Sequence, residues 1–134
     1  MAAPTEFEWS YLAGILDGEG NIFLQIKSDR AKTCALNIRV RIANTDKDLM
    51  DWIQEKFGGN LTISKGRTFH HKIVYQIAWY KQAEVLRILE GVLPYLIVKS
   101  WVAKNVVGLL LLPKDLPLEK LRLAEFIKEA QYHG

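Results

Sequence analysis

The stretch that decides the fold is Trp9–Gly20, WSYLAGILDGEG, which begins as an apolar run and ends in two carboxylates set among glycines. Just before it, Thr5 and Glu8 have the spacing of a capping box. In that motif the hydroxyl accepts a hydrogen bond from a backbone N–H, and the carboxylate reaches back to the capping residue. The spacing predicts a helix from Glu6 to about Asp17.

This helix is apolar on more sides than an ordinary surface helix. The residues that we expect to cover a core are Phe7, Tyr11, Leu12, Ile15 and Leu16. Gly14 and Gly18 form a separate bare stripe. A glycine inside a helix costs roughly 1 kcal/mol relative to alanine, so two on one face indicate the close approach of another backbone. The alternative is that these glycines merely end the helix.

Composition narrows the class of protein. A length of 134 residues favours one domain over positions 1–134, and 49% hydrophobic with 25% charged residues is typical of a globular protein. Cys34 is the only cysteine, so no intrachain disulfide is possible, which suits a reducing compartment. The longest apolar run, Val106–Leu112, is far shorter than the ~18 residues of a membrane span. Because the N-terminus also lacks a signal-peptide pattern, we expect an intracellular protein.

Positive charge is concentrated in two blocks, although the net charge is only +3. Residues 21–45 and 59–82 together hold nine Lys or Arg residues and one acidic residue. The rest of the chain holds nine Lys or Arg residues and fourteen acidic residues. A solvated basic surface explains any one of these residues. The segregation of the whole set favours a sheet that binds a polyanion.

Period-two alternation of apolar and polar residues predicts four strands, at Asn21–Asp29, Leu36–Ile42, Asn60–Ser64 and Lys72–Trp79. Helical patterns separate and follow them, at Asp46–Phe57, Gln82–Leu93, Val98–Leu112 and Leu118–Tyr132. The order predicts an α+β fold, with a four-stranded antiparallel sheet covered by helices on one face. Residues 113–134 form a C-terminal helical extension in this scheme.

The nonapeptide Leu12–Gly20, LAGILDGEG, resembles the signature of the LAGLIDADG homing endonucleases, or meganucleases. Ile15 and Leu16 exchange the two aliphatic letters, while Gly18 and Glu19 stand for Ala and the second Asp. The resemblance implies an αββαββα fold with a saddle-shaped sheet. One copy of the signature implies a homodimer, with an interface at Leu12, Gly14, Asp17 and Gly18.

The resemblance places the chemistry at Glu19, since the second acid of the motif ligates metal in the family. A carboxylate at a helix end can bind Mg²⁺ through oxygen, and two chains packed through their glycines would bring two such acids together. The backbone carbonyl of Gly18 is the other metal-binding group implied. The expected ion is Mg²⁺, with Mn²⁺ substituting and Ca²⁺ supporting binding without cleavage. Asp17 is expected to be structural and to cap its partner helix.

Two further positions match the family's catalytic set. Lys99 follows Pro94 by five residues and is expected to stabilise charge on the phosphate; the alternative is an exposed lysine at a helix start. Asn44 follows the second strand, where the family keeps a polar residue that orders solvent. Asn44 is equally well explained as a turn residue or a helix cap.

The outward residues of the strands and hairpins correspond by position to the base-reading set of the family. Gln25 suits adenine, and Lys27, Arg39 or Arg41 suits guanine, whereas hairpin cations suit phosphates. Phe23 either contacts a thymine methyl or is a plain surface aromatic. The expected DNA-binding residues are Phe23, Gln25, Lys27, Asp29, Arg30, Lys32, Asn37, Arg39, Arg41, Asn60, Thr62, Ser64, Arg67, Lys72, Val74 and Gln76.

The resemblance therefore implies a homodimeric homing endonuclease that makes Mg²⁺-dependent double-strand breaks in a long, palindromic or nearly palindromic DNA site and leaves short 3′ overhangs. One alternative is a relative that binds nucleic acid without cleaving it, such as an intron maturase or a regulator. Another is a plain dimeric interaction domain, which would leave the basic strands unexplained.

Overall fold

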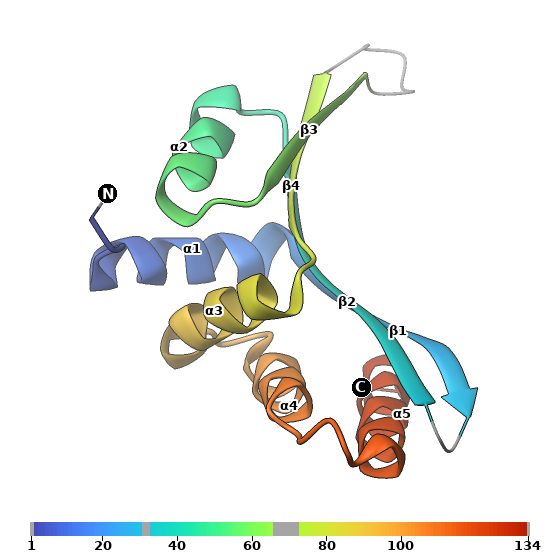
Figure 1. Ribbon diagram of the computed structural model, residues 1–134. Coiled ribbons are helices and arrows are strands. Elements are labelled where there is room, and N and C mark those ends of the chain that lie inside the picture. The colour runs from blue at the N-terminus through green and yellow to red at the C-terminus, as the bar shows by residue number, and fades with distance from the viewer. Residues whose placement is uncertain (1, 31–32, 66–72, 134) are drawn as a thin grey trace.

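A computed structural model describes residues 2–30, 33–65 and 73–133 of the chain (Figure 1). Five helices, one short 3-10 turn and four strands are found there. Their order is α1 (Glu6–Glu19), β1 (Gly20–Arg30), β2 (Thr33–Asn44), α2 (Lys47–Phe57), β3 (Asn60–Lys65), β4 (Ile73–Trp79), α3 (Gln82–Val92), η1 (Leu93–Tyr95), α4 (Ser100–Leu110) and α5 (Pro117–His133). The predicted order of elements and the α+β class are confirmed.

Helix α1 starts at the predicted capping box. The Thr5 backbone N–H donates to Glu8 Oε1 over 2.8 Å, and the Glu8 N–H donates to Thr5 Oγ1 over 3.2 Å. The hydrogen bond from the Thr5 N–H stabilises the ionised form of the Glu8 side chain and so holds the pKa of Glu8 below its ordinary value. The helix continues two residues beyond the predicted end and stops at Gly20, whose N–H donates to the Leu16 carbonyl. Neither Gly14 nor Gly18 ends it.

The four strands form one antiparallel sheet in the order β1-β2-β4-β3. Figure 1 shows a curved sheet with the described helices on its convex side and its concave side uncovered. Helix α1 meets the middle of the sheet end-on, between α2 and α3. This arrangement brings the C-terminal end of α1 to the sheet, so that the acids of the motif lie near the two basic strand pairs.

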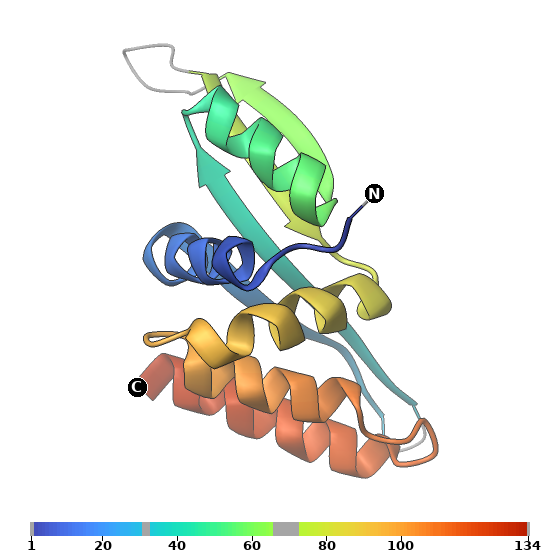
Figure 2. The same ribbon diagram turned by 90° about the vertical axis from the view of Figure 1, so that its left-hand side faces the viewer.

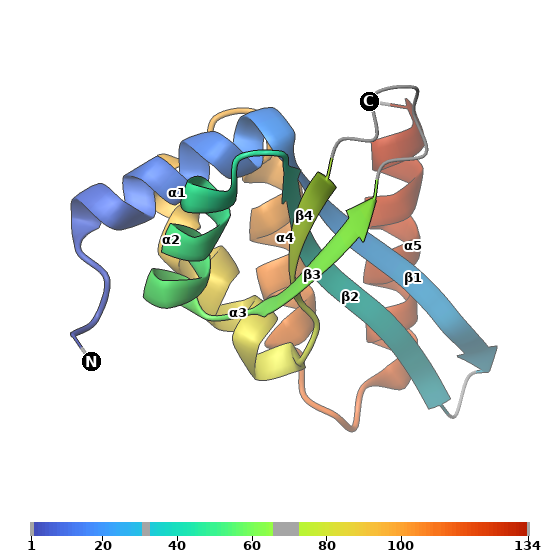
Figure 3. The same ribbon diagram turned by 90° about the horizontal axis from the view of Figure 1, so that it is seen from above.

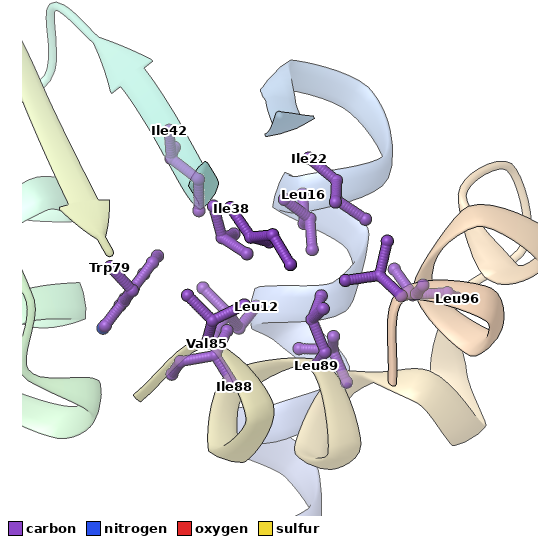
Figure 4. Packing of buried hydrophobic residues seen from close by; sticks show 14 of the residues in the cluster. Leu12, Leu16, Ile22, Ile38, Ile42, Trp79, Val85, Ile88, Leu89 and Leu96 are labelled. Atoms are coloured by element: carbon purple, nitrogen blue, oxygen red, sulfur yellow. The ribbon is translucent and has the colours of Figure 1, made fainter. Parts of the chain in front are cut away.

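The core lies between the helices and the convex side of the sheet, and Figure 4 shows the part of it around α1 and α3. Leu12 and Leu16 from α1, Trp79 from β4 and Leu89 from α3 are all fully buried there. The indole N–H of Trp79 donates to the Phe57 carbonyl over 3.1 Å, so its polar atom is satisfied inside the apolar cluster.

Two residues of α1 that were expected in the core are exposed instead. Phe7 is 87% exposed and Tyr11 is 58% exposed, so the expectation that they cover the core is wrong. Leu12 and Leu16 are buried as predicted, and Ile15 is partly buried against the core. The reason is that α3 and the sheet cover only one side of α1. Figure 3 shows α1 along the upper edge of the molecule, where only the connection from η1 to α4 reaches beyond it.

Helix α5 covers one of the two edges of the sheet, at strand β1. Lys128 Nζ donates to the Leu24 carbonyl of β1 over 3.1 Å, and Gln131 Nε2 donates to the Ile22 carbonyl. Such cover satisfies carbonyls of an edge strand and blocks edge-to-edge pairing with another sheet. Figure 2 shows α5 lying alongside α4. Among the helices described, none combines the length and the apolar character that crossing a membrane requires.

Candidate active site and nucleic-acid interface

The last turn of α1 presents Glu19 to solvent. Its carboxylate accepts a hydrogen bond from Asn44 Nδ2, although the two residues lie 25 positions apart. Asn44 Oδ1 accepts from the Asp46 backbone N–H over 2.8 Å, and Asp46 in turn caps α2 by accepting from the Leu49 N–H. The interpretation as a turn residue fits these contacts, because the Asn44 oxygen accepts from the backbone of the turn before α2. The cap of α2 is Asp46, and the amide of Asn44 orients Glu19.

Asp17 lies on another side of the same turn and holds the segment between η1 and α4. Its two carboxylate oxygens accept from the Ile97 N–H over 2.7 Å and from the Lys99 N–H over 2.9 Å. Partial burial by itself raises the pKa of the Asp17 carboxyl. This effect is outweighed by hydrogen bonds from the backbone of Ile97, Lys99 and Val98 and by the charge of Lys99, so the pKa of Asp17 lies below its ordinary value. Asp17 thus caps backbone N–H groups of its own chain, whereas the sequence analysis expected it to cap the partner helix.

Lys99 is half-buried, and its Nζ donates to the Asp17 backbone carbonyl over 2.8 Å. This bond places a positive charge at the C-terminal end of α1, where the carbonyls of a helix end carry partial negative charge. The ammonium adjoins a small hollow of about 200 Å³ lined by Gly20, Asn21, Ile22, Lys99, Val102 and Gln131. Glu19, Asn44 and Lys99, the predicted catalytic residues, are therefore all tied to the last turn of α1.

A single chain offers few metal ligands. Among the described residues, no group of three His, Cys, Asp or Glu side chains could hold an ion together. Glu19 and Gly18 are exposed, so oxygen atoms of other molecules have room beside them. Mg²⁺ usually keeps several waters and binds one or two carboxylates together with substrate phosphates. The donor set fits an ion shared with a substrate or a second chain.

The concave side of the sheet carries the predicted nucleic-acid residues. The register pairs Gln25 with Asn37 and Phe23 with Arg39 across β1 and β2, and Thr62 with Gln76 across β3 and β4. A hollow of about 450 Å³ opens there, lined by Lys27, Asn37, Arg39, Arg41, Asn60, Thr62, Gln76, Ala78 and Tyr80. Val74 and Ser64 pair farther out along the same two strands.

Phe23 supports two arginines on this surface. The guanidinium carbons of Arg39 and Arg41 lie 5.9 Å and 5.3 Å from the centre of its ring, within the range of cation–π attraction. Arg39 Nε also donates to Asn37 Oδ1 over 3.3 Å, and Asn37 Nδ2 donates to Gln25 Oε1 over 3.4 Å. Five of the predicted readers, on β1 and β2, thus form one connected network: Gln25, Asn37, Arg39, Phe23 and Arg41. Phe23 has a role that neither sequence interpretation included.

Some predicted residues lie outside what the structure describes. These are Lys32, Arg67 and Lys72, together with the side chains of Asp29 and Arg30. Three residues of the surface, Asn21, Ala78 and Tyr80, were missing from the prediction. Asn21 pairs with Arg41 and shares the outward face with Phe23, so the same alternation could have found it. Ala78 and Tyr80 continue the outward alternation of Gln76, so the period of β4 could have found both, although Tyr80 lies one residue beyond the end of the strand.

The glycine stripe of α1 faces outward. A Cβ atom added to Gly14 or Gly18 would have no other heavy atom within 4 Å outside its own helical backbone. Leu12, which was also expected at the dimer interface, is instead fully buried in the core of its own chain. Phe7, Tyr11, Gly14 and Gly18 are exposed and share one face of α1, and we call this set of four residues the α1 stripe.

In this α+β fold, an exposed carboxylate held by a hydrogen bond adjoins a basic concave sheet. The chain belongs to the LAGLIDADG endonuclease family, whose model matches residues 12–99. It is accordingly a DNA endonuclease, as the resemblance of the motif implied.

Solved structures agree with this assignment at the level of the fold. The homing endonuclease I-CvuI, bound to its target in the presence of Ca, is 24% identical with a TM-score of 0.70; the match covers 92% of this chain and 82% of that one. I-TnaI, another homing endonuclease, is 16% identical with a TM-score of 0.62, and the match covers 98% and 99% of the two chains. The match to I-SmaMI has a TM-score of 0.70 at 18% identity and covers 94% of this chain and 45% of that one. None of the curated proteins matches the chain significantly.

Proposed function

We propose that two copies of this chain form a homing endonuclease that cuts both strands of one long, palindromic or nearly palindromic DNA site and leaves short 3′ overhangs. The observation that carries this proposal is the placement of Glu19, exposed at the end of α1 and oriented by Asn44, beside a basic concave sheet. I-CvuI and I-Vdi141I, which share the fold, have been solved with DNA, and this supports DNA as the partner.

The α1 stripe supports the homodimer. Its members recur every three or four residues and so lie on one face of the helix. The two glycines let a second backbone approach closely, while the exposed rings of Phe7 and Tyr11 leave apolar surface that a partner would bury. A two-fold axis along this stripe would place the two Glu19 carboxylates on either side of the axis, one for each DNA strand.

Within the site, we assign each side chain a separate task. Asn44 holds the Glu19 carboxylate in one orientation, and the Lys99 ammonium supplies positive charge for the phosphate in the transition state. Glu19 and the Gly18 carbonyl, contributed by both copies, would hold Mg²⁺. A bound divalent ion supplies a water of lowered pKa and stabilises the leaving oxygen.

The concave sheet would read the DNA. Its strands fit a major groove, where each base pair presents a distinct pattern of donors and acceptors. Arg39 and Arg41 suit guanine, and Gln25 suits adenine; Phe23 keeps the two guanidiniums in place beneath the groove. Lys27 extends the positive charge along β1. Cations of the hairpins would bind phosphates, which position the protein without reading sequence.

The proposal is tested with the variant Glu19→Gln. This change keeps the size and the hydrogen bond from Asn44 but removes the charge that a metal needs. We expect cleavage of a random palindrome library in Mg²⁺ to fall to background, while binding of the selected sites in Ca²⁺ stays within a few-fold of the unaltered protein.

The matched control is Glu55→Gln, at an exposed position of α2, which should cut normally. If Glu19→Gln cleaves DNA as well as the unaltered protein does, Glu19 is not required for cleavage. If the unaltered chain binds selected DNA in every divalent ion but never cuts it, the chain is a non-cleaving binder, and the nuclease proposal fails.

A further inference from the structure

The part of the sheet that carries Phe23 and Gln25 has only two strands in the described chain. Strand β1 pairs with β2 along almost its whole length, whereas β4 pairs with β2 only at Val40–Asn44. Phe23 pairs with Arg39, and Gln25 with Asn37, beyond that range. These four residues therefore lie on a ribbon of β1 and β2 that extends past the rest of the sheet (Figure 1). Because a two-stranded ribbon twists strongly and is only marginally stable by itself, it needs a support.

Helix α5 is that support. Its residues Leu121, Ala124 and Ile127 are buried, and Figure 1 shows the helix beside the ribbon. Apolar contacts are not directional, so they hold two elements together without fixing where one lies along the other. A hollow of about 200 Å³ also separates the helix from the strand, and it is lined by Asn21, Ile22, Phe23, Leu24, Lys128 and Gln131. The position of β1 at this hollow therefore depends on polar contacts.

Two side chains of α5 at this hollow bind the backbone of β1. Lys128 Nζ donates to the Leu24 carbonyl over 3.1 Å, and Gln131 Nε2 donates to the Ile22 carbonyl over 3.5 Å. Strand β1 is an edge strand, so these carbonyls find their partners on a helix. Hydrogen bonds are directional, and these two lie on either side of Phe23 in the chain. They hold the backbone of Phe23 from both of its neighbours.

The position of Phe23 matters because its ring supports two arginines. The guanidiniums of Arg39 and Arg41 both lie over that ring, and the attraction weakens when the ring moves away. A bidentate contact from arginine to guanine requires both donors at fixed places on the base edge. A shift of β1 would therefore disturb these readers. It would leave Thr62 and Gln76, which pair with each other on β3 and β4, where they are.

We propose that Lys128 and Gln131 are positioning residues, which set the base specificity of the concave sheet by fixing Phe23 beneath its two arginines. This inference rests on the reading of DNA by the concave sheet proposed above. Lys128 acts through β1 and not through a phosphate, because the residue is partly buried and its ammonium is bound to a backbone carbonyl. Readers held by such a support need not be ordered when DNA binds.

The specificity profile of single variants tests this inference. The probes are the best palindromic duplex selected by binding from a random library and a set of duplexes that replace each of its base pairs in turn. The readout is the affinity of each duplex in Ca²⁺. Arg39→Met identifies the base pairs that are read from β1 and β2, and Gln76→Met identifies those that are read from β3 and β4.

Lys128→Met and Gln131→Met each remove a donor and keep a long side chain. Each should lower the discrimination at the Arg39-dependent base pairs by roughly fivefold or more, which is the lower range of what one bidentate contact supplies. Discrimination at the Gln76-dependent base pairs should stay unchanged. Lys128→Arg keeps a charged donor and should keep the profile, as should the matched control Glu129→Gln at an exposed position of α5. Discrimination is a ratio of two affinities from one preparation, so a fraction of unfolded protein does not alter it.

The outcomes separate this inference from the proposed function. If the unaltered protein shows no base preference, the concave sheet does not read DNA, and both fail. If Arg39→Met changes the profile and neither α5 variant does, only the inference fails. An equal loss at both sets of base pairs, or a loss in Lys128→Arg as large as in Lys128→Met, would also overturn it. So would uniform weakening by Lys128→Met with a salt slope reduced by about one phosphate contact, because Lys128 would then be a phosphate ligand.

Discussion

At the scale of single residues, the last turn of α1 is organised by side chains that each make two kinds of contact. Asn44 accepts from the turn before α2 and donates to Glu19. Asp17 accepts from two backbone N–H groups, and its own carbonyl accepts from Lys99. A side chain fixed at two points loses its rotamer freedom during folding, not during the reaction. The site is therefore organised before any substrate binds.

Asp17→Asn should destabilise the chain by roughly 1 kcal/mol at neutral pH, since two charge-assisted hydrogen bonds become ordinary or are lost. The folded pKa of Asp17 lies below the ordinary value of 3.8, so its ionised form stabilises the fold above that pH. This stability is lost as the pH falls through the lower folded pKa. Denaturation of both proteins from pH 7 to pH 2 should show the difference shrinking below about pH 3.8.

The control for this measurement is Asp115→Asn, at an exposed position between α4 and α5. It should leave the stability almost unchanged at every pH. A constant difference between Asp17→Asn and the unaltered chain down to pH 2 would contradict the assignment of that stability to the Asp17 charge.

At the scale of elements, α1 is positioned by close packing against α2 and α3 on one side, whereas its other side is exposed. Trp9 packs against Phe57 of α2, with ring centres 4.8 Å apart and the ring planes tilted by 58°, and it also covers Gly91 of α3. A Cβ atom at Gly91 would overlap the Trp9 ring. The absence of a side chain there lets α3 lie against α1, and this contact sets the angle at which α1 reaches the sheet.

Gly91→Ala should therefore destabilise the fold, because overpacking costs roughly 1–3 kcal/mol and exceeds the gain in helix propensity of about 1 kcal/mol. Gly108→Ala in α4 is the matched control, since a Cβ atom there meets nothing within 4 Å. That variant should gain up to about 1 kcal/mol. Urea denaturation of the two variants measures both changes. Equal stability of the two would show that the Trp9 ring moves aside at no cost.

At the scale of the whole molecule, the segregation of charge matches the separation of the two sides of the sheet. The strand-containing blocks hold nine Lys or Arg and one acid, and their outward residues line the concave surface. The helices on the convex side carry most of the acids. A polyanion is therefore drawn to one side of the molecule and repelled from the other.

DNA binding should weaken steeply with salt, by roughly 0.9 log unit per log unit of salt for each phosphate contact. Lys27→Gln on the concave sheet should weaken binding at low salt, with a smaller difference at high salt. Lys114→Gln, at an exposed position beyond α4, is the matched control and should follow the unaltered protein. Titrations at several salt concentrations give both slopes. If the logarithm of the binding affinity does not change with the logarithm of the salt concentration, the concave sheet is not the surface that binds DNA.

The family assignment and the order of the elements followed from local patterns. The capping box set the start of α1, and the alternation of Phe23 and Gln25 with buried neighbours separated the two faces of β1. Such patterns are readable because helix caps act within one turn and strand side chains alternate with period two. The direction in which most side chains point therefore depends on residues close in sequence.

The sequence by itself determined the elements, their polar and apolar faces, and the acids at the end of α1. Only the tertiary structure decided that Phe7 and Tyr11 stay exposed, because a helix pattern does not say how many of its sides neighbours will cover. The same holds for Asp17, whose partner Ile97 lies 80 positions away, and for Phe23 beneath two arginines. Contacts between residues distant in the chain are set by packing, and no local periodicity encodes them.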